Sequence, residues 1–273
     1  RGLHPPRCGA RGRARHGPRH PPFRHARPHI RVGPGLKVCD NVQPNWHEYC
    51  AAPQCGQLDL TCPRTLDVVK TLLTEVSRLF PDPVVHLGAD EINRRCYEDF
   101  LDSGHSDVDA LIGRFMTSVV GHVQALNKTV QLWEETALDF RIAYPKSTVF
   151  QAWRGPSSTA ALVQAGFHVV VSDSGAWYLD CGLGSWVDGG QSWCEFKTWQ
   201  TMYEFDPANN LDERQGALVD GGEAAVWTEK VDMHNLEQIV WPRLAAVAEV
   251  LWSPNDLGPT WCGLHGGCSP SRK

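Results

Sequence analysis

The sequence predicts an α/β fold with a parallel sheet of five strands, of the kind found in (β/α)8 barrels. The first observation is that short β-branched segments alternate with amphipathic helical segments from residue 63 onward. Such alternation is typical of a parallel sheet with helices between its strands. The second observation is that each predicted strand ends in polar or aromatic residues. In a (β/α)8 barrel, the carboxyl ends of the strands form the face that carries the active site.

Length and charge narrow the classes of protein. A chain of 273 residues with 42% hydrophobic residues is long enough for a sizeable core, in one large domain or two small ones. Residues 1–37 carry ten of the 26 Lys and Arg residues and no acid, so the remainder has 16 basic against 31 acidic residues, a difference of −15. That acidic body argues against nucleic-acid binding. No apolar stretch approaches the roughly 20 residues that cross a bilayer, so we expect no transmembrane segment, and we expect no signal peptide within this sequence.

The first 34 residues differ from the rest. They are rich in Arg, Pro, His and Gly and lack aliphatic periodicity. Such a segment buries too little apolar surface to order itself, so we expect disorder over residues 1–34. A basic arm for nucleic acid and a His-rich metal tract are the alternatives, and we disfavour both.

The first elements lead to a pair of acids. Residues 35–62 are loop-like, and residues 63–80 have apolar side chains at helical spacing, which predicts an amphipathic helix. Residues 84–87 are brief and β-branched and follow two prolines, so they predict a short, buried strand. The strand stops at Gly88, and Asp90 and Glu91 follow after Ala89.

Adjacent acids at this point suggest catalysis. Consecutive strand residues point to opposite faces, so both acids reach one pocket only where the strand gives way to a loop. Two carboxylates in a confined site do not both ionise cheaply, so one of them can act as a general acid near neutral pH. The alternative is that Asp90 and Glu91 simply cap the next helix.

The same pattern repeats along the chain. Further helices are predicted at residues 108–127, 158–165 and 236–251, and further strands at residues 129–135, 148–153, 167–172 and 222–227. Four tryptophans lie at or just beyond strand ends, namely Trp133, Trp153, Trp177 and Trp227. Any one of them could be a buried core residue. Together, aromatic walls beside paired acids are how proteins usually hold sugar rings.

At these residues the chain resembles the family 20 glycoside hydrolases, the β-N-acetylhexosaminidases. His86-Leu87-Gly88-Ala89-Asp90-Glu91 is similar to that family's H-x-G-G-D-E signature, with Ala89 in place of the second glycine. Similar later motifs follow in the same order, at residues 131–135, 151–153, 177–180, 221–224, 227–229 and 236–253. The resemblance runs from about Gly35 to Ser253, and its details are closest to the arthropod-type enzymes.

The resemblance implies a substrate-assisted, retaining mechanism, which is an exception to the usual two-carboxylate rule. The substrate's own acetamido oxygen attacks the anomeric carbon, Glu91 serves as general acid and then base, and Asp90 holds the acetamido N–H. Tyr178 would hydrogen-bond the acetamido carbonyl. The N-acetyl group and the sugar face would be enclosed by Trp133, Trp153 and Trp227. The outer hydroxyls would donate hydrogen bonds to Asp180 and Glu229. His86 would support the site from behind, or be an ordinary core histidine.

Ten cysteines without a CxxC pair suggest disulfides and an oxidising compartment more than zinc. The resemblance implies three pairings, which are Cys39 with Cys96, Cys50 with Cys55, and Cys181 with Cys194. We therefore expect a glycoprotein of the secretory pathway, either extracellular, lysosomal or membrane-associated, with one glycosylation sequon at Asn127. We expect no metal and no cofactor.

The chain also departs from the family. The family has three strands before the acid pair, and residues 1–34 do not match them, so residues 35–253 are expected to form a partial barrel of about strands 4 to 8. Residues 254–273 form a divergent tail. The resemblance implies an exo-hexosaminidase acting on terminal N-acetylhexosamine, with a homodimer possible in the full-length protein. Whether this chain is active alone stays open, as does the substrate: chitin oligosaccharide, N-glycan or glycolipid. The alternative is an inactive N-acetylglucosamine-binding protein.

Overall fold

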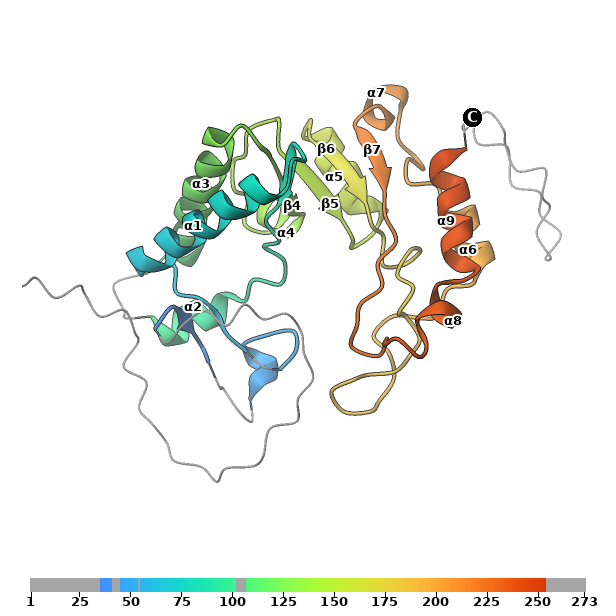
Figure 1. Cartoon of the computed structure of the whole chain (residues 1–273), viewed down its shortest axis with the longest axis horizontal. Coiled ribbons are helices and arrows are strands. Elements are labelled where there is room, and N and C mark those ends of the chain that lie inside the picture. Colours follow the sequence, from blue (N-terminus) through green and yellow to red (C-terminus); the bar gives the residue numbers. More distant parts are fainter. Residues whose placement is uncertain (1–34, 41–44, 54, 102–106, 254–273) are drawn as a thin grey trace, which may run out of the picture.

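The computed structural model describes residues 35–40, 45–53, 55–101 and 107–253. Its centre is a parallel sheet of five strands in the order β3-β4-β5-β6-β7, which lies between two groups of helices (Figure 1). The strands are β3 (Val84–His86), β4 (Thr129–Trp133), β5 (Val149–Ala152), β6 (His168–Val171) and β7 (Val219–Gly222). A parallel sheet with helices between consecutive strands confirms the predicted partial (β/α)8 barrel. The predictions for residues 1–34 and 254–273 lie outside the described residues.

The two faces of the sheet differ in polarity. Alternate strand residues such as Val130, Leu132 and Phe150 are buried in the main apolar core with the helices. Because strand side chains alternate between faces, the residues between them point the other way. Two of these are Gln131 and Gln151, whose side chains hydrogen-bond at 3.5 Å. The face that a complete barrel would enclose is therefore partly polar.

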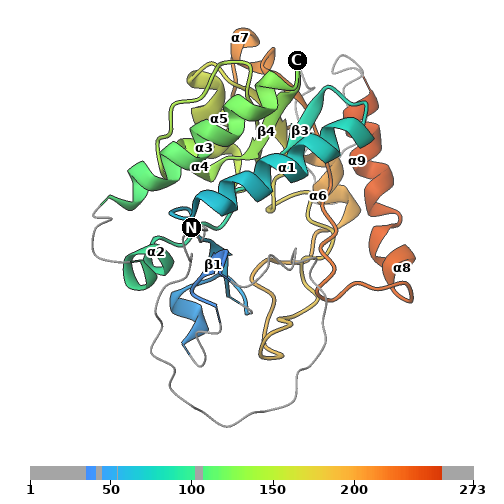
Figure 2. The ribbon, with the colours of Figure 1, turned by 60° about the vertical axis from the view of Figure 1, so that its left-hand side comes forward.

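Helices cover the apolar face. The two long ones, α1 (Pro63–Leu79) and α3 (Val108–Ala125), lie side by side in both views (Figures 1 and 2). His122 Nε2 lies 2.9 Å from Thr74 Oγ1 between them. Farther along the sheet, α4 (Glu135–Leu138) follows β4 and α5 (Pro156–Gln164) follows β5. The predicted helices over residues 63–80, 108–127 and 158–165 are confirmed to within a few residues.

A second apolar core lies beyond β7. It gathers α6 (Trp199–Glu204), α8 (Leu236–Val240) and α9 (Arg243–Trp252) around Trp177 and Met202. Trp177 is completely buried, and its indole Nε1 donates to the Met202 carbonyl at 3.1 Å. For Trp177, the alternative of a core tryptophan is therefore the correct one.

Two predicted elements are confirmed only in part. Within residues 222–227, Ala225 makes no more than an isolated parallel bridge to Tyr178. The strand expected at residues 222–227 is β7 at Val219–Gly222 instead, and the apolar residues Ala224 and Val226 pack in the second core. A continuous apolar run does not say which core it enters, so periodicity misplaced it. The helix expected at residues 236–251 is interrupted before Arg243, because Pro242 lacks the amide hydrogen and its ring clashes with a helix interior.

Other differences lie in segments expected to be loops. Residues 35–62 contain a two-stranded antiparallel ladder, β1 (Lys37–Val38) with β2 (Gln57–Leu58), and a 3-10 turn, η1 (Trp46–Glu48). Short helices form at α2 (Arg94–Phe100), α6 and α7 (Glu213–Gly216). All are too short for a periodic signal. The strand expected to be buried, β3, has Val84 and His86 exposed because it is the edge strand of the described sheet. No helix in the described ranges has both the length and the apolar character to span a bilayer.

Candidate active site

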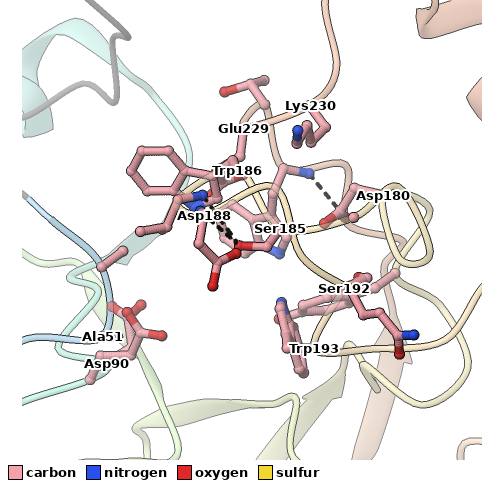
Figure 3. Close-up of a pocket in the computed structure, with 18 of the residues that line it drawn as sticks. Ala51, Asp90, Asp180, Ser185, Trp186, Asp188, Ser192, Trp193, Glu229 and Lys230 are labelled. Carbon is pink, nitrogen blue, oxygen red and sulfur yellow. Dashed lines mark hydrogen bonds between the residues drawn. The ribbon is translucent and has the colours of Figure 1, made fainter. Parts of the chain in front are cut away.

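A pocket of about 810 Å³ lies where the strands end. Its lining includes all eight residues that the sequence assigned to catalysis or sugar binding: Asp90, Glu91, Trp133, Trp153, Tyr178, Asp180, Trp227 and Glu229. Figure 3 shows Asp90 on one side of the pocket, with Asp180 and Trp193 across from it. Residues more than a hundred positions apart are brought together because parallel strands place their carboxyl ends at one edge.

The acid pair lies on an unusual turn. Gly88, Ala89 and Glu91 have φ angles of 71°, 71° and 52°, in the left-handed region that glycine adopts most easily. The turn is tied to β4, because Trp133 N–H donates to the Gly88 carbonyl at 3.1 Å. Both acids are exposed to the pocket. This backbone turns two consecutive side chains toward one space, as the sequence argument required.

The helix-cap alternative for this pair is wrong. The next helix, α2, begins at Arg94, and its N-cap is Asn93. The Asn93 side chain accepts the Cys96 N–H at 3.2 Å, which is the usual bond of an N-cap residue. Asp90 and Glu91 are therefore not needed to cap α2.

His86 supports the acid-bearing turn from β3. Its Nδ1 accepts the Gly88 N–H at 3.0 Å, and its ring meets Trp133 edge-on at 5.3 Å between centroids. Partial desolvation of the ring lowers the pKa of His86, against the opposing effect of the Glu223 and Asp90 carboxylates. His86 is exposed, so it is not the core histidine that was the alternative.

Aromatic rings form most of the wall. Trp153 and Tyr178 lie nearly parallel, with centroids 6.5 Å apart and an interplanar angle of 15°. Trp227 lies 6.0 Å from Tyr178 and 6.2 Å from Trp133. Burial raises the pKa of the Tyr178 hydroxyl well above its usual range, so this group is a neutral hydrogen-bond donor at any physiological pH. Together these rings provide flat apolar surfaces with a polar hydroxyl between them, which suits an amide-bearing sugar.

Two further carboxylates lie at the far side of the pocket. Asp180 Oδ1 accepts the Trp227 N–H at 3.1 Å, which links the two loops that carry these residues. Partial burial raises the pKa of Asp180, against the Trp227 hydrogen bond, and the neighbouring Glu229 carboxylate adds to the rise. Both acids are half-buried, so they can accept hydrogen bonds from hydroxyl groups in the pocket.

Several lining residues were missed by the sequence argument. Trp46 comes from η1, and Trp186 and Trp193 come from the loop that Cys181 and Cys194 close. Trp193 meets both Trp153 and Tyr178 edge-on, at 6.2 Å and 6.1 Å. The high tryptophan count hinted at further aromatic lining residues. These tryptophans do not follow strands, however, so their positions in the sequence did not single them out.

Disulfides hold the loops of this site. Cys39–Cys96, Cys50–Cys55 and Cys181–Cys194 all form, which confirms the three predicted pairings. Cys39–Cys96 ties the segment before α1 to α2, just after the acid pair. Within the described ranges, no three His, Cys, Asp or Glu side chains are grouped as a metal site requires.

Comparison with known sequences identifies the family. A profile of the glycosyl hydrolase family 20 catalytic domain matches residues 23–255. This chain belongs to glycosyl hydrolase family 20. The probable β-hexosaminidase fdl of Drosophila melanogaster is 34% identical over 233 residues, which are 81% of this chain and 35% of that protein. The chitooligosaccharidolytic β-N-acetylglucosaminidase of Ostrinia furnacalis is 29% identical over 240 residues, 80% of this chain and 40% of its own length. The family 20 chain thus spans less than half of either relative.

Solved family 20 structures agree with the fold. A mutant Streptomyces plicatus β-hexosaminidase in complex with the product GlcNAc superposes with a TM-score of 0.61 and 27% identity, over 75% of this chain and 40% of that one. The β-N-acetylhexosaminidase of Streptomyces coelicolor A3(2) gives a TM-score of 0.58 and 28% identity, over 72% of this chain and 39% of that one. The described part of the family 20 chain is therefore a partial α/β barrel, and the family is one of glycoside hydrolases.

Proposed function

We propose that this chain carries the active site of an exo-acting β-N-acetylhexosaminidase. The enzyme would remove terminal, non-reducing N-acetylglucosamine or N-acetylgalactosamine. The observation that carries the proposal is the adjacent pair Asp90 and Glu91, turned into one pocket by a left-handed backbone and faced by aromatic rings. An enzyme with two separated carboxylates holds one on each side of the sugar. An adjacent pair suits a reaction in which the substrate supplies the nucleophile.

The reaction would have two steps. In the first, the acetamido oxygen attacks the anomeric carbon while Glu91 protonates the departing glycosidic oxygen, which gives an oxazolinium ion and the free leaving group. Asp90 accepts the acetamido N–H and stabilises the positive charge that develops on the ring. In the second step, Glu91 takes a proton from water, which attacks the same carbon and reopens the ring. Two inversions at one carbon retain its configuration.

The pocket wall would orient the substrate for this reaction. The Tyr178 hydroxyl would donate to the acetamido oxygen, which aligns it for attack. Trp133, Trp153 and Trp227 would enclose the N-acetyl group and the sugar face. Asp180 and Glu229 would accept hydrogen bonds from the outer hydroxyls, so that only a terminal sugar fits.

The substrate and setting of the whole protein are also proposals. Two insect relatives are named chitooligosaccharidolytic enzymes, and a chitin oligosaccharide, an N-glycan and a glycolipid all present the same terminal unit. The three disulfides that join described cysteines support a secretory-pathway protein. Asn127 is exposed at the turn between α3 and β4, where a glycan has room. A homodimer is proposed for the full-length protein.

Binding and hydrolysis need separate tests. We expect a bicyclic thiazoline analogue of the oxazolinium ion to bind the chain at least a hundredfold more tightly than N-acetylglucosamine, because intermediates of this kind resemble the transition state. Calorimetry measures both affinities. Asp90→Asn should weaken the analogue much more than the sugar. Equal affinity for the two compounds would argue against substrate assistance.

A fluorogenic N-acetylglucosaminide then tests turnover. Any activity of the chain should fall by roughly a hundred- to ten-thousandfold in Glu91→Gln, the loss expected for a general acid. The alternative function is N-acetylglucosamine binding without hydrolysis. The observation that favours this alternative is that the described sheet ends in two edge strands, β3 and β7. A sheet that does not close into a barrel leaves one side of the pocket without strands. Tight binding without turnover would support that alternative.

A further inference from the structure

One buried carboxyl beside the pocket has no part in the proposed reaction. Glu135 is the first residue of α4, two positions after the end of β4, and only 5% of its surface is exposed. Its Oε1 accepts the indole N–H of Trp153 at 2.9 Å. Its Oε2 is also buried and has no hydrogen-bond partner among the described residues. A buried carboxyl with one bonded and one unbonded oxygen is costly, which calls for an explanation.

The bond from Glu135 acts on a residue of the pocket wall. Trp153 lies nearly parallel to Tyr178 and edge-on to Trp193. Its backbone N–H is held separately, by the fully buried Glu134 at 3.1 Å. Glu134 therefore fixes the backbone position of Trp153, and Glu135 fixes the orientation of its indole ring. A tryptophan side chain has two free torsions, and one bond at Nε1 is enough to select an orientation.

We propose that Glu135 is a positioning residue for Trp153, and that the charge on its carboxyl sets how firmly the indole is held in the pocket wall. A carboxylate accepts an N–H bond roughly twice as strongly as a neutral acid does. The ionised form of Glu135 therefore holds the ring in its stacked position, and the protonated form loosens it.

The surroundings of Glu135 place this change near neutral pH. Burial raises the pKa of Glu135 to about 7, against its own backbone N–H, the Trp153 hydrogen bond and the Arg154 guanidinium, and the Glu134 carboxylate adds to the rise. Arg154 is held by Glu134 and Asp139, so its charge faces Glu135 at all relevant pH values. Tyr178, across the pocket wall, stays neutral. The ring of Trp153 should therefore be firmly held above about pH 7 and looser below it.

The indole resonance of Trp153 tests this inference directly. In a nitrogen–proton correlation spectrum of the full chain, the signal lost in Trp153→Phe identifies that indole. We expect its chemical shift to titrate with a midpoint near the pKa of about 7. In Glu135→Gln, which keeps an acceptor oxygen but not the charge, the shift should stay constant with pH. The indole of Trp177 is the internal control, because it donates to a backbone carbonyl that does not titrate.

A second measurement reports on the site. The expected effect on sugar binding rests on the proposed function, whereas the expected titration of the Trp153 indole is independent of it. Glu135→Met removes the acceptor while keeping side-chain length, and N-acetylglucosamine should bind it about tenfold more weakly, because the indole N–H loses its partner. Thermal unfolding confirms that each variant is folded.

The outcomes separate the two claims. A Trp153 indole shift that is constant with pH, or that titrates equally in Glu135→Gln, overturns the positioning role. So does a Glu135→Met variant that binds the sugar as well as the unaltered chain. If no sugar binds at all but the indole titrates as expected, the positioning role stands and the proposed function fails.

Discussion

At the scale of single residues, Glu135 links the site to the stability of the fold. Its pKa is raised from 4.5 to about 7 by burial, so the folded protein binds its proton more tightly than the unfolded chain does. The neutral carboxyl therefore contributes stability that is fully present below about pH 4.5 and is lost as the pH rises through about 7.

Glu135→Gln should remove this pH dependence. Relative to the variant, we expect the unaltered chain to lose about 1 to 3 kcal/mol of unfolding free energy between pH 4.5 and pH 8. Urea unfolding at several pH values measures the difference. Glu98→Gln, at an exposed position of α2, is the control. A constant difference between Glu135→Gln and the unaltered chain across this range would contradict the prediction.

The turn that carries the acid pair offers a second residue-scale test. Ala89 has φ 71°, where a side chain costs about 1–2 kcal/mol and a glycine loses roughly 0.5–1 kcal/mol more backbone entropy on folding. Ala89→Gly should therefore stabilise the chain by about 0.5–1 kcal/mol. Thermal unfolding measures it. Ala161→Gly, on the exposed side of α5, should instead destabilise by about 1 kcal/mol, and the same sign for both variants would refute the strain argument.

At the scale of elements, loops rather than strands complete the pocket. The loop closed by Cys181 and Cys194 contributes Trp186 and Trp193 to the pocket. The first residue of this loop, Gly182, is tightly packed against Phe196. A Cβ at Gly182 would lie 2.5 Å from the Phe196 side chain, and the φ of Gly182 is 88°. The disulfide joins the two ends of this loop. The positions of its aromatic residues therefore depend more on this covalent bond than on packing in an apolar core.

Replacing both cysteines of this loop with serine should loosen the pocket wall without unfolding the sheet. The chain-entropy argument gives about 3 kcal/mol for a loop of this length, and we expect N-acetylglucosamine binding to weaken while far-ultraviolet circular dichroism stays the same. Limited chymotrypsin digestion, followed by mass spectrometry, should show new cuts within residues 182–193. The matched control replaces Cys50 and Cys55, which leaves this loop closed. Equal protection of the loop in both variants would show that the disulfide is not what holds it.

At the scale of the whole molecule, the described sheet ends in two edge strands, β3 and β7. Edge strands present unpaired backbone groups that can pair with another chain. Val84 on β3 is 38% exposed, so one of these edges also presents apolar surface. We infer that this chain tends to associate with itself through its sheet.

Sedimentation velocity tests that tendency. We expect this chain to associate increasingly with concentration, and Val84→Lys to reduce association, because a charged edge residue resists strand pairing. Val68→Lys is the matched control, since Val68 is 40% exposed but lies on α1, away from the strand edge. If both substitutions reduce association equally, exposed apolar surface in general, and not the strand edge, is responsible.

Local pattern was enough to predict much of this molecule. The spacing of apolar residues predicted α1 and α3, and short β-branched runs predicted β3 to β6, because these elements bury one continuous set of side chains against one core. The acid pair could be recognised for a similar reason, since it lies in the turn that follows a strand. Ala224 and Val226 pack against the second core. There, the apolar run predicted the strand a few residues too late in the chain.

What the sequence determined by itself is the family, most of the sheet, and which residues meet at its carboxyl edge. Those follow from periodicity and from the parallel connection of strands. Tertiary structure alone decided the orientation of the meeting residues: the left-handed turn at Ala89 and Glu91, the Trp153 ring held by Glu135, and the loop that brings Trp193 to the wall. These depend on contacts between residues distant in the chain, whose energies no local pattern records.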